Sequence, residues 1–245
     1  MVYRMTVTPM LEEYGTDLRL SPAGILKIFE NAATRHAAAV GDSVAACLSR
    51  GEAWYLTDWY VEIYTRIPPG LRVKVETFCR KSEHSRGLYR EFRMRDEGGS
   101  LIACSTSKWA RVKLPEGRIL PTDEAVFARY GALKRSVFEE EPRIPRHSAA
   151  CIDAEKTVAL RRGDFDMHGH VHNLVYLDYA FEAIPKAVYD AHAVRAFHIS
   201  YVKPICSGEA VTVKCRTTDE GYTVFIEADG TLRARVVLWA EHSES

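Results

Sequence analysis

The spacing of apolar residues along this chain alternates between two periods, and each period indicates a different element. Residues 3–7 alternate apolar and polar side chains, which predicts a short strand. Ser21-Pro22 then opens a segment in which apolar residues recur every three or four positions. Serine caps helix N-termini and proline fits the first helical turn, so we expect a long helix that stops at Gly41. Its apolar stripe consists of Ile25, Ile28, Phe29, Ala32, His36 and Val40.

After this helix the period changes to two. Turn residues interrupt the alternation at Pro68-Pro69-Gly70 and at Gly98-Gly99, which favours strands joined by hairpins. The expected strands cover residues 53–65, 71–79, 87–94 and 100–112. A helix followed by hairpin-connected strands is typical of an α+β fold in which one antiparallel sheet wraps the helix.

The same order of elements returns in the second half of the chain. Residues 113–150 are rich in proline and charge, which is typical of a linker, here with a short helix near residues 124–133. Beyond it we expect a strand at 156–162, a helix at 174–188 that bends or ends at Pro185, and strands at 193–205, 209–217, 221–228 and 231–241. Such a repeat indicates duplication. We assign a first unit to residues 1–112, a linker to 113–150 and a second unit to 151–245.

Composition and charge exclude several classes of function. Lys plus Arg and Asp plus Glu number 33 each, which argues against general attraction to nucleic acid or anionic membranes. No apolar run reaches the roughly 18 residues that a membrane-spanning helix needs, and the N-terminal segment alternates like a strand rather than forming an apolar signal segment. We therefore expect a cytoplasmic protein that neither binds nucleic acid nor inserts into a membrane.

The six cysteines lack the paired spacing of a disulfide framework or a zinc site. Most lie in apolar strand segments, so we expect buried thiols. They are Cys47, Cys79, Cys104, Cys151, Cys206 and Cys215. The three alternating histidines of residues 168–172 could be metal ligands, but the sequence shows no fourth ligand and no residues that would orient the ligands from outside. We expect neither a metal nor another cofactor.

The densest group of chemistry-bearing side chains lies just before the second-unit helix. Asp166, His168 and His170 occupy alternate positions there. Unpaired backbone N–H groups and the positive end of the helix dipole favour a carboxylate, or an oxyanion that forms in a reaction, at such a place. The helix itself is expected to bury the face that comprises Leu174, Leu177, Phe181, Ile184 and Val188.

The run from Asp166 to Asn173, DMHGHVHN, resembles the D-x-N-x-H-V-N-N signature of the acyl-ACP thioesterases, and Tyr176, Glu182 and Pro185 match the Y…E…P that follows it. The segment LSPAGILKIFENAATRHAAAVG is similar to the first helix of the same family, so the resemblance covers nearly the whole chain. It implies two tandem HotDog units, each a long helix wrapped by a curved antiparallel sheet. It also implies hydrolysis of fatty acyl-ACP to free fatty acid and holo-ACP, in fatty acid biosynthesis.

Two positions depart from the family pattern. His168 stands where the family has asparagine; a neutral imidazole can still donate one hydrogen bond, but it would add a pH dependence. Pro204 stands where the family has a downstream glutamate, and proline has no acid–base group. Either Glu209 replaces that carboxylate, or the reaction runs on the Asp and His residues alone.

Hydrolysis of a thioester needs an activated water or a nucleophile, a stabilised oxyanion and a dry tunnel for the acyl chain. We assign Asp166 as general base or nucleophile, His170 as the group that orients water or shares its proton, and His168 as a positioning group. The N–H groups of residues 169–172 are the expected oxyanion site. In the alternative interpretation Asp166 only caps the helix and the histidines fill polar gaps. Residues 17–21 hold the equivalent region of the first unit without histidine, so we expect one active site per chain.

Two rival functions stay open: a thioesterase that acts on acyl-CoA, and a HotDog protein that binds acyl thioesters without turnover. Because the carrier protein is acidic, the resemblance implies a basic docking patch. The candidates are Arg86, Arg90, Arg93 and Arg95, or Arg143 and Arg146. The acyl chain length and the oligomeric state also stay open, with a homodimer as one alternative.

Overall fold

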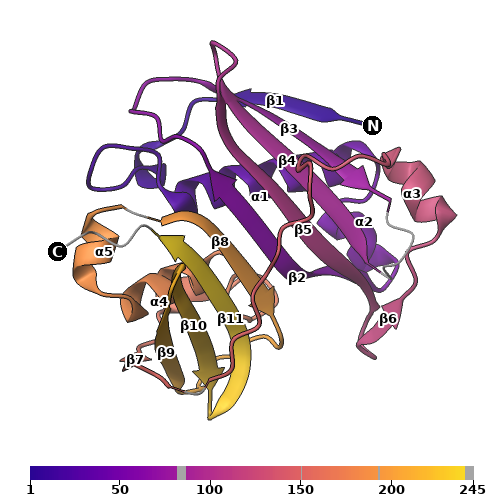
Figure 1. The fold of residues 1–245 in the computed structure, drawn as a ribbon. Coiled ribbons are helices and arrows are strands. Elements are labelled where there is room, and N and C mark those ends of the chain that lie inside the picture. Colours follow the sequence, from indigo (N-terminus) through magenta and orange to yellow (C-terminus); the bar gives the residue numbers. More distant parts are fainter. Residues whose placement is uncertain (82–86, 150, 193, 241–245) are drawn as a thin grey trace. The chain divides into compact units, whose positions relative to one another are not determined.

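A computed structural model describes residues 1–81, 87–149, 151–192 and 194–240 (Figure 1). The chain divides into two compact units, Met1–Glu141 and Pro142–Ser245, and each unit contains its own helix and antiparallel sheet. Within the described residues, every helix is too short or too polar to cross a lipid bilayer.

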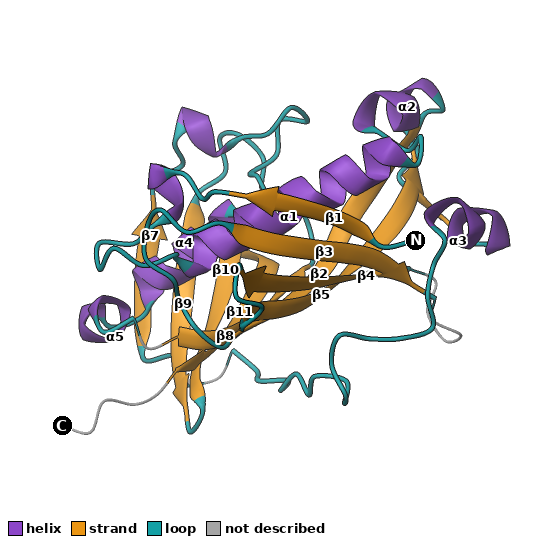
Figure 2. Ribbon diagram, turned by 90° about the horizontal axis from the view of Figure 1, so that it is seen from above, coloured by secondary structure: helices purple, strands orange, loops and turns teal. Residues whose placement is uncertain are grey.

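In the first unit, α1 (Pro22–Ala39) runs alongside a sheet with the strand order β1-β3-β4-β5-β2, and β6 pairs with β5 (Figure 2). The strands are β1 (Tyr3–Val7), β2 (Glu52–Ile63), β3 (Val73–Arg80), β4 (Leu88–Asp96), β5 (Leu101–Lys113) and β6 (Arg118–Leu120). The short helices are η1 (Leu11–Glu13), α2 (Val44–Ser49) and α3 (Glu124–Tyr130). The strands expected in residues 3–112 and the short helix near 124–133 are confirmed.

The start of α1 is the one that its sequence predicts. Ser21 Oγ accepts a hydrogen bond from the backbone N–H of Gly24 at 2.9 Å, and Pro22 occupies the first helical turn. The buried face of the helix meets aromatic residues of the sheet, with the ring of Phe29 5.0 Å from that of Phe92. The ring of Trp59 stacks on that of Phe92, with the ring centroids 6.0 Å apart. The long amphipathic helix is therefore confirmed.

The second unit has the strand order β8-β11-β10-β9-β7 and a shorter helix. Its elements are β7 (Ala154–Val158), η2 (Arg162–Asp164), α4 (Val175–Ala183), α5 (Lys186–Asp190), β8 (Val194–Tyr201), β9 (Val211–Thr218), β10 (Gly221–Ala228) and β11 (Thr231–Ala240). The strand expected at 156–162 is placed too late. It stops at Val158 because Arg161 N–H donates to the Asp164 carboxylate at 2.9 Å and turns the chain into η2.

The helix α4 ends before Pro185, as predicted, and its buried face is confirmed only in part, with Ile184 and Val188 just beyond the helix buried as expected. Leu177 is buried, whereas Phe181 is only partly covered. The face turns toward Tyr176 and Tyr179, which are 2% and 3% exposed. The predicted face counted only Leu, Ile, Val and Phe and left out tyrosine, which is readily buried when its hydroxyl has a hydrogen-bond partner.

The expectation for the cysteines is partly wrong. Cys47, Cys79, Cys104 and Cys215 are buried free thiols, as predicted. Cys151 and Cys206 are exposed, because both lie in connecting segments rather than in strands.

Candidate active site

Asp166 begins the turn that leads toward α4, and its carboxylate organises that turn. Oδ1 accepts hydrogen bonds from the backbone N–H groups of His168 at 2.8 Å and His170 at 3.3 Å. The main chain closes the same turn, because Asp166 N–H donates to the carbonyl of His170 at 2.8 Å. Oδ2 has no hydrogen-bond partner among the residues that the structure describes. One oxygen therefore holds the turn, and the other is left for chemistry.

The three predicted site residues all lie on this turn but differ in exposure. Asp166 and His170 are half-buried, whereas His168 is exposed. His172 follows them and accepts a hydrogen bond at Nδ1 from Leu174 N–H at 3.4 Å, which places its ring at the entry of the helix. In the described part of the chain, no group of three or more His, Cys, Asp or Glu residues is arranged to hold a metal ion.

The backbone N–H groups expected to form an oxyanion site are already in use. All four N–H groups of residues 169–172 donate within the protein. Their acceptors, in chain order, are the carbonyl of Asp166 at 3.0 Å, the carboxylate of Asp166 at 3.3 Å, the carbonyl of Ile205 at 2.9 Å and the carbonyl of Asp164 at 2.8 Å. The expectation of free N–H groups there is wrong, because these bonds are what forms the turn.

Asp164 anchors the turn from behind, a role that the sequence analysis missed. Its carboxylate, in a residue that is 2% exposed, accepts hydrogen bonds from the Tyr179 hydroxyl at 2.7 Å and from Arg161 Nε at 2.9 Å. Burial alone would raise the pKa of this carboxyl, but the hydrogen bonds from Arg161 and Tyr179 outweigh burial and lower the pKa. The one sequence signal for this role is an acid three residues after Arg161, the spacing of a capping box.

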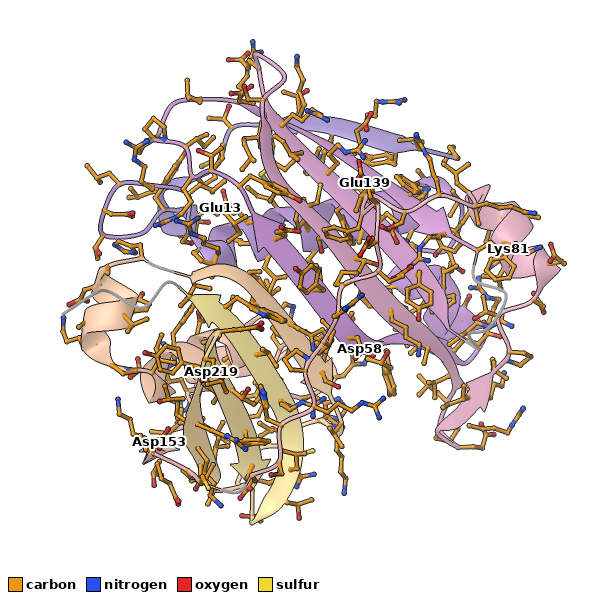
Figure 3. The ribbon with its side chains drawn as sticks, in the orientation of Figure 1. Glu13, Asp58, Lys81, Glu139, Asp153 and Asp219 are labelled. Atoms are coloured by element: carbon orange, nitrogen blue, oxygen red, sulfur yellow. The ribbon has the colours of Figure 1, made fainter. Side chains whose placement is uncertain are left out.

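The first unit repeats this turn, but without a carboxylate at the position of Asp166. Gly15 N–H donates to the Arg19 carbonyl at 2.8 Å, as Asp166 N–H donates to His170. The matched positions are Glu13 (labelled in Figure 3) with Asp164, Gly15 with Asp166, Asp17 with His168, Arg19 with His170 and Ser21 with His172. Glycine at the position of Asp166 removes the matching carboxylate, and the Asp17 carboxylate of the first-unit turn forms an ion pair with Arg66 at 2.8 Å.

Glu209, the predicted substitute for a missing glutamate, is held in place by two partners. One oxygen accepts a hydrogen bond from Cys206 N–H at 2.6 Å, and the other forms an ion pair with Arg233, whose side chain is 6% exposed. Both oxygens of Glu209 therefore have partners within the second unit. Pro204 is exposed and contributes no polar side chain.

The arginines proposed for docking are not one patch. Arg90 is 4% exposed and donates to Nδ1 of His36 at 2.8 Å, so its assignment to a surface patch is wrong. Burial and then the charge of Arg90 lower the pKa of His36 to about 3, which keeps that imidazole neutral as an acceptor. Arg86 lies outside the described residues, and Arg143 and Arg146 are exposed.

A second set of cations gathers on the first-unit sheet, in what we call the basic strand surface. It is a pocket of about 400 Å³ whose charged lining residues are Arg4, Lys74, Glu76, Arg93 and Arg95. Strand register explains the grouping, because Arg4 lies opposite Glu76, which lies opposite Arg93. Lys74 lies opposite Arg95 in the next row of the same face. Four cations surround a single carboxylate, so the surface is positive.

Comparison with known proteins identifies the family. Residues 1–130 match the family profile described as the acyl-ACP thioesterase N-terminal domain, and residues 149–236 match the profile of the C-terminal domain. The chain belongs to the acyl-ACP thioesterase family. This membership confirms the family that the sequence motif suggested.

Relatives and solved structures agree with this assignment to the acyl-ACP thioesterases. The chain is 25% identical to oleoyl-acyl carrier protein thioesterase 2 of Arabidopsis thaliana over 95% of its own length and 67% of that protein. It is 24% identical to dodecanoyl-[acyl-carrier-protein] hydrolase of Cinnamomum camphora over 90% of its length and 60% of that protein. The chain thus spans roughly two thirds or less of the length of these curated relatives.

The fold matches those of solved acyl-ACP thioesterases. The 12:0-ACP thioesterase from Umbellularia californica superposes with a TM-score of 0.86 at 18% identity, with 98% of this chain and 97% of that chain covered. An acyl-ACP thioesterase from Bacteroides thetaiotaomicron gives a TM-score of 0.85 at 19% identity, with 98% of both chains covered. The predicted α+β architecture of two HotDog units is confirmed.

Proposed function

We propose that this chain is a thioester hydrolase that releases free fatty acid from an acylated acyl carrier protein, with its chemistry at Asp166. Membership in the family and the activities in the names of its relatives support the reaction class. The observation that carries the proposal is the geometry of Asp166. One of its oxygens is fixed by the N–H groups of His168 and His170, and the other is available to a bound water.

In the proposed reaction, Oδ2 of Asp166 takes a proton from water as the water oxygen attacks the thioester carbonyl carbon. The C–S bond then breaks, and the leaving thiolate takes the proton back from Asp166, directly or through His170. Because the nearby backbone N–H groups are in use, the His170 imidazole is the donor that we assign to the developing oxyanion. His168, which is exposed, positions Asp166 through its backbone N–H.

A nucleophilic role for Asp166 is the alternative chemistry. Oδ2 would then attack the carbonyl carbon and expel the thiolate, and water would hydrolyse the resulting anhydride. A single turnover in isotopically labelled water tests this alternative. Label in Asp166 would establish the anhydride, because water reaches the aspartyl carboxyl only by attack on the aspartyl carbonyl of that intermediate.

The first experiment measures thiol release from a panel of acyl-ACPs by the wild type and by Asp166→Asn. Loss of a general base lowers turnover by roughly a hundredfold or more. Asp219→Asn is the matched control, since Asp219 is an exposed aspartate of the same unit in the turn between β9 and β10 (Figure 3). Wild-type activity that survives in Asp166→Asn would contradict the assignment.

Two rival functions have specific support. Pro204 removes a carboxylate, and Glu209 is engaged with Arg233, so a protein that binds acyl thioesters without turnover is the alternative from another class. Thermal stabilisation by acyl-ACP with no thiol release would establish it. An acyl-CoA thioesterase is the alternative within enzymes, and equal specificity constants for one acyl group on both carriers would favour it.

We further propose that the basic strand surface receives the acidic carrier protein. Its excess of cations supports this, because complementary charge speeds the encounter of two proteins. The double variant Arg93→Glu, Arg95→Glu should raise KM for acyl-ACP by roughly tenfold and leave hydrolysis of small acyl thioesters unchanged. An equal effect on both substrates would contradict docking. Arg143→Glu, Arg146→Glu tests the other candidate pair, which is exposed, in the same assay.

A further inference from the structure

A pocket of about 440 Å³ lies beside the candidate catalytic turn in the second unit. It is lined by the segment 160–162 ahead of the turn, by Phe165 and Gly169 of the turn itself, and by residues 207–209 after β8. Two main-chain contacts join the turn to the residues just before 207–209: the hydrogen bond from Val171 N–H to the Ile205 carbonyl at 2.9 Å and the bridge between His170 and Cys206. The pocket is therefore built on the same framework as the catalytic turn.

The pocket contains one cation that its neighbours do not balance. Arg161 forms an ion pair with Asp164, and Glu209 forms one with Arg233. Arg162 is exposed, and neither an ion pair nor a hydrogen bond links its side chain to any residue that the structure describes. The charged groups of the lining therefore leave a net positive charge, at Arg162, and the pocket attracts an anion.

The remaining lining groups indicate which other chemical groups the anionic ligand carries. Ser207 offers a hydroxyl, and Gly208 lets a ligand approach the backbone closely, since nothing lies within 4 Å of the place that a Cβ would occupy. Leu160 and Phe165 supply an apolar wall. A fitting ligand combines an anionic group, hydrogen-bonding groups and a compact apolar part. The phosphopantoyl end of a phosphopantetheine arm has these three features: a phosphodiester, a hydroxyl with an amide, and two geminal methyl groups.

We propose that this pocket binds the phosphopantoyl part of the arm that carries the acyl group, with the Arg162 guanidinium paired to the phosphodiester. Planar guanidinium groups bind phosphate oxygens in pairs, which suits Arg162 better than a lysine would. Gly169 then borders the path of the arm toward Asp166, and no atom lies within 4 Å of its absent Cβ. The inference rests on the proposed function and adds to it the residue that recognises the arm.

The test compares substrates that differ only in the phosphate. KM and kcat are measured with one acyl group on 4′-phosphopantetheine and on pantetheine, for the wild type, Arg162→Ala and Arg162→Lys. Arg162→Ala should raise KM for the phosphorylated substrate roughly tenfold, the loss of one charge-assisted contact, with kcat and both constants for acyl-pantetheine unchanged. Arg162→Lys should recover part of the loss. Arg118→Ala is the matched control, an exposed arginine of the first unit.

Binding keeps the inference testable if turnover is absent. The affinities of 4′-phosphopantetheine and of pantetheine are measured by calorimetry on the wild type and on Arg162→Ala. A phosphate-dependent preference that Arg162→Ala abolishes supports the pocket even if no thioester is hydrolysed, in which case only the proposed reaction fails. Equal affinities for the two compounds, or a KM change of the same size on both substrates, would overturn the assignment of Arg162.

Discussion

At the residue scale, two aspartates of the turn differ in how well the sequence predicts their roles: Asp166, which is proposed to carry the chemistry, and Asp164, which fixes the turn. Asp166 and His170 were recognisable because a family signature specifies both residue type and spacing. Asp164 was not recognisable, since most acidic residues in a polar segment are simply exposed to solvent. Its role depends on Tyr179 fifteen residues later, which reaches it only after α4 has formed. The side chain that does the proposed chemistry is therefore more visible in sequence than the one that fixes the turn.

Asp164→Asn should destabilise the protein at neutral pH by about 2 kcal/mol, because a neutral amide cannot accept from all the donors that surround this position. The pKa of Asp164 is lowered in the folded state, so its ionised form contributes stability above about pH 4, the range of a free aspartate. That contribution is lost as pH falls through the lowered pKa. Denaturant unfolding from pH 7 to 3 should therefore show the difference between wild type and variant shrinking below about pH 4. A difference that stays constant over this range would refute the charge-based explanation.

At the element scale, the two copies of the turn have the same backbone conformation but place different residues at its left-handed position. Each turn is closed by a backbone hydrogen bond from Asp166 or Gly15, and the residue three positions later has the left-handed backbone conformation. Gly169 takes that conformation with φ +75°, whereas Leu18 takes it in the first unit with φ 56°. Leucine is strained in this region, and glycine is not. Apolar spacing predicts the repeat of elements and places residues 17–21 in the position of 168–172, as the structure confirms. It does not predict the backbone hydrogen bonds that close both turns, since side-chain patterns do not encode them.

This difference predicts opposite effects of two substitutions. Gly169→Ala should lower the free energy of unfolding by about 1 kcal/mol, because a Cβ at positive φ is strained even though space is open around it. Leu18→Gly should raise it by roughly 0.5 kcal/mol, the relief of strain less the added freedom of the unfolded chain. Both are measured by denaturant titration. Equal signs for the two variants would show that φ does not decide the outcome.

At the scale of the whole molecule, the sequence predicts a linker after β6 because that segment is rich in proline and charge, as true linkers are. Here it is tied to the first unit. The helix α3 buries Phe127 and Tyr130 in a cluster with Cys79 and Leu88. Further along, the aromatic ring of Phe138 meets that of Tyr60 at 5.4 Å. The composition of a segment shows that it cannot form a hydrophobic core by itself. It does not show whether the segment packs against the core of a neighbouring unit.

Glu91 is the residue that fastens this segment to the sheet. It is fully buried on β4, and its two carboxylate oxygens divide their partners between the sheet and the segment. Oε1 accepts from Arg80 Nε at 2.7 Å and Thr106 Oγ1 at 3.0 Å, and Oε2 accepts from Val137 N–H at 3.0 Å and Ser136 Oγ at 3.2 Å. Hydrogen bonds to a charged acceptor are stronger than those between neutral groups, so Glu91 holds residues 136–137 against the sheet.

Hydrogen exchange on the full chain tests this attachment at a single amide. The Val137 N–H should exchange slowly in the wild type, in step with the amides of β4, because it opens only when Glu91 is released. Glu91→Gln keeps the shape but loses the charge and one acceptor oxygen, and should speed exchange at Val137 by roughly tenfold or more, the effect of about 1.4 kcal/mol. Glu76→Gln is the matched control, since Glu76 is a partly exposed glutamate of β3 in the same sheet. Rapid exchange at Val137 in the wild type would mean that residues 136–138 are a loose linker after all, and that the first unit ends with its sheet.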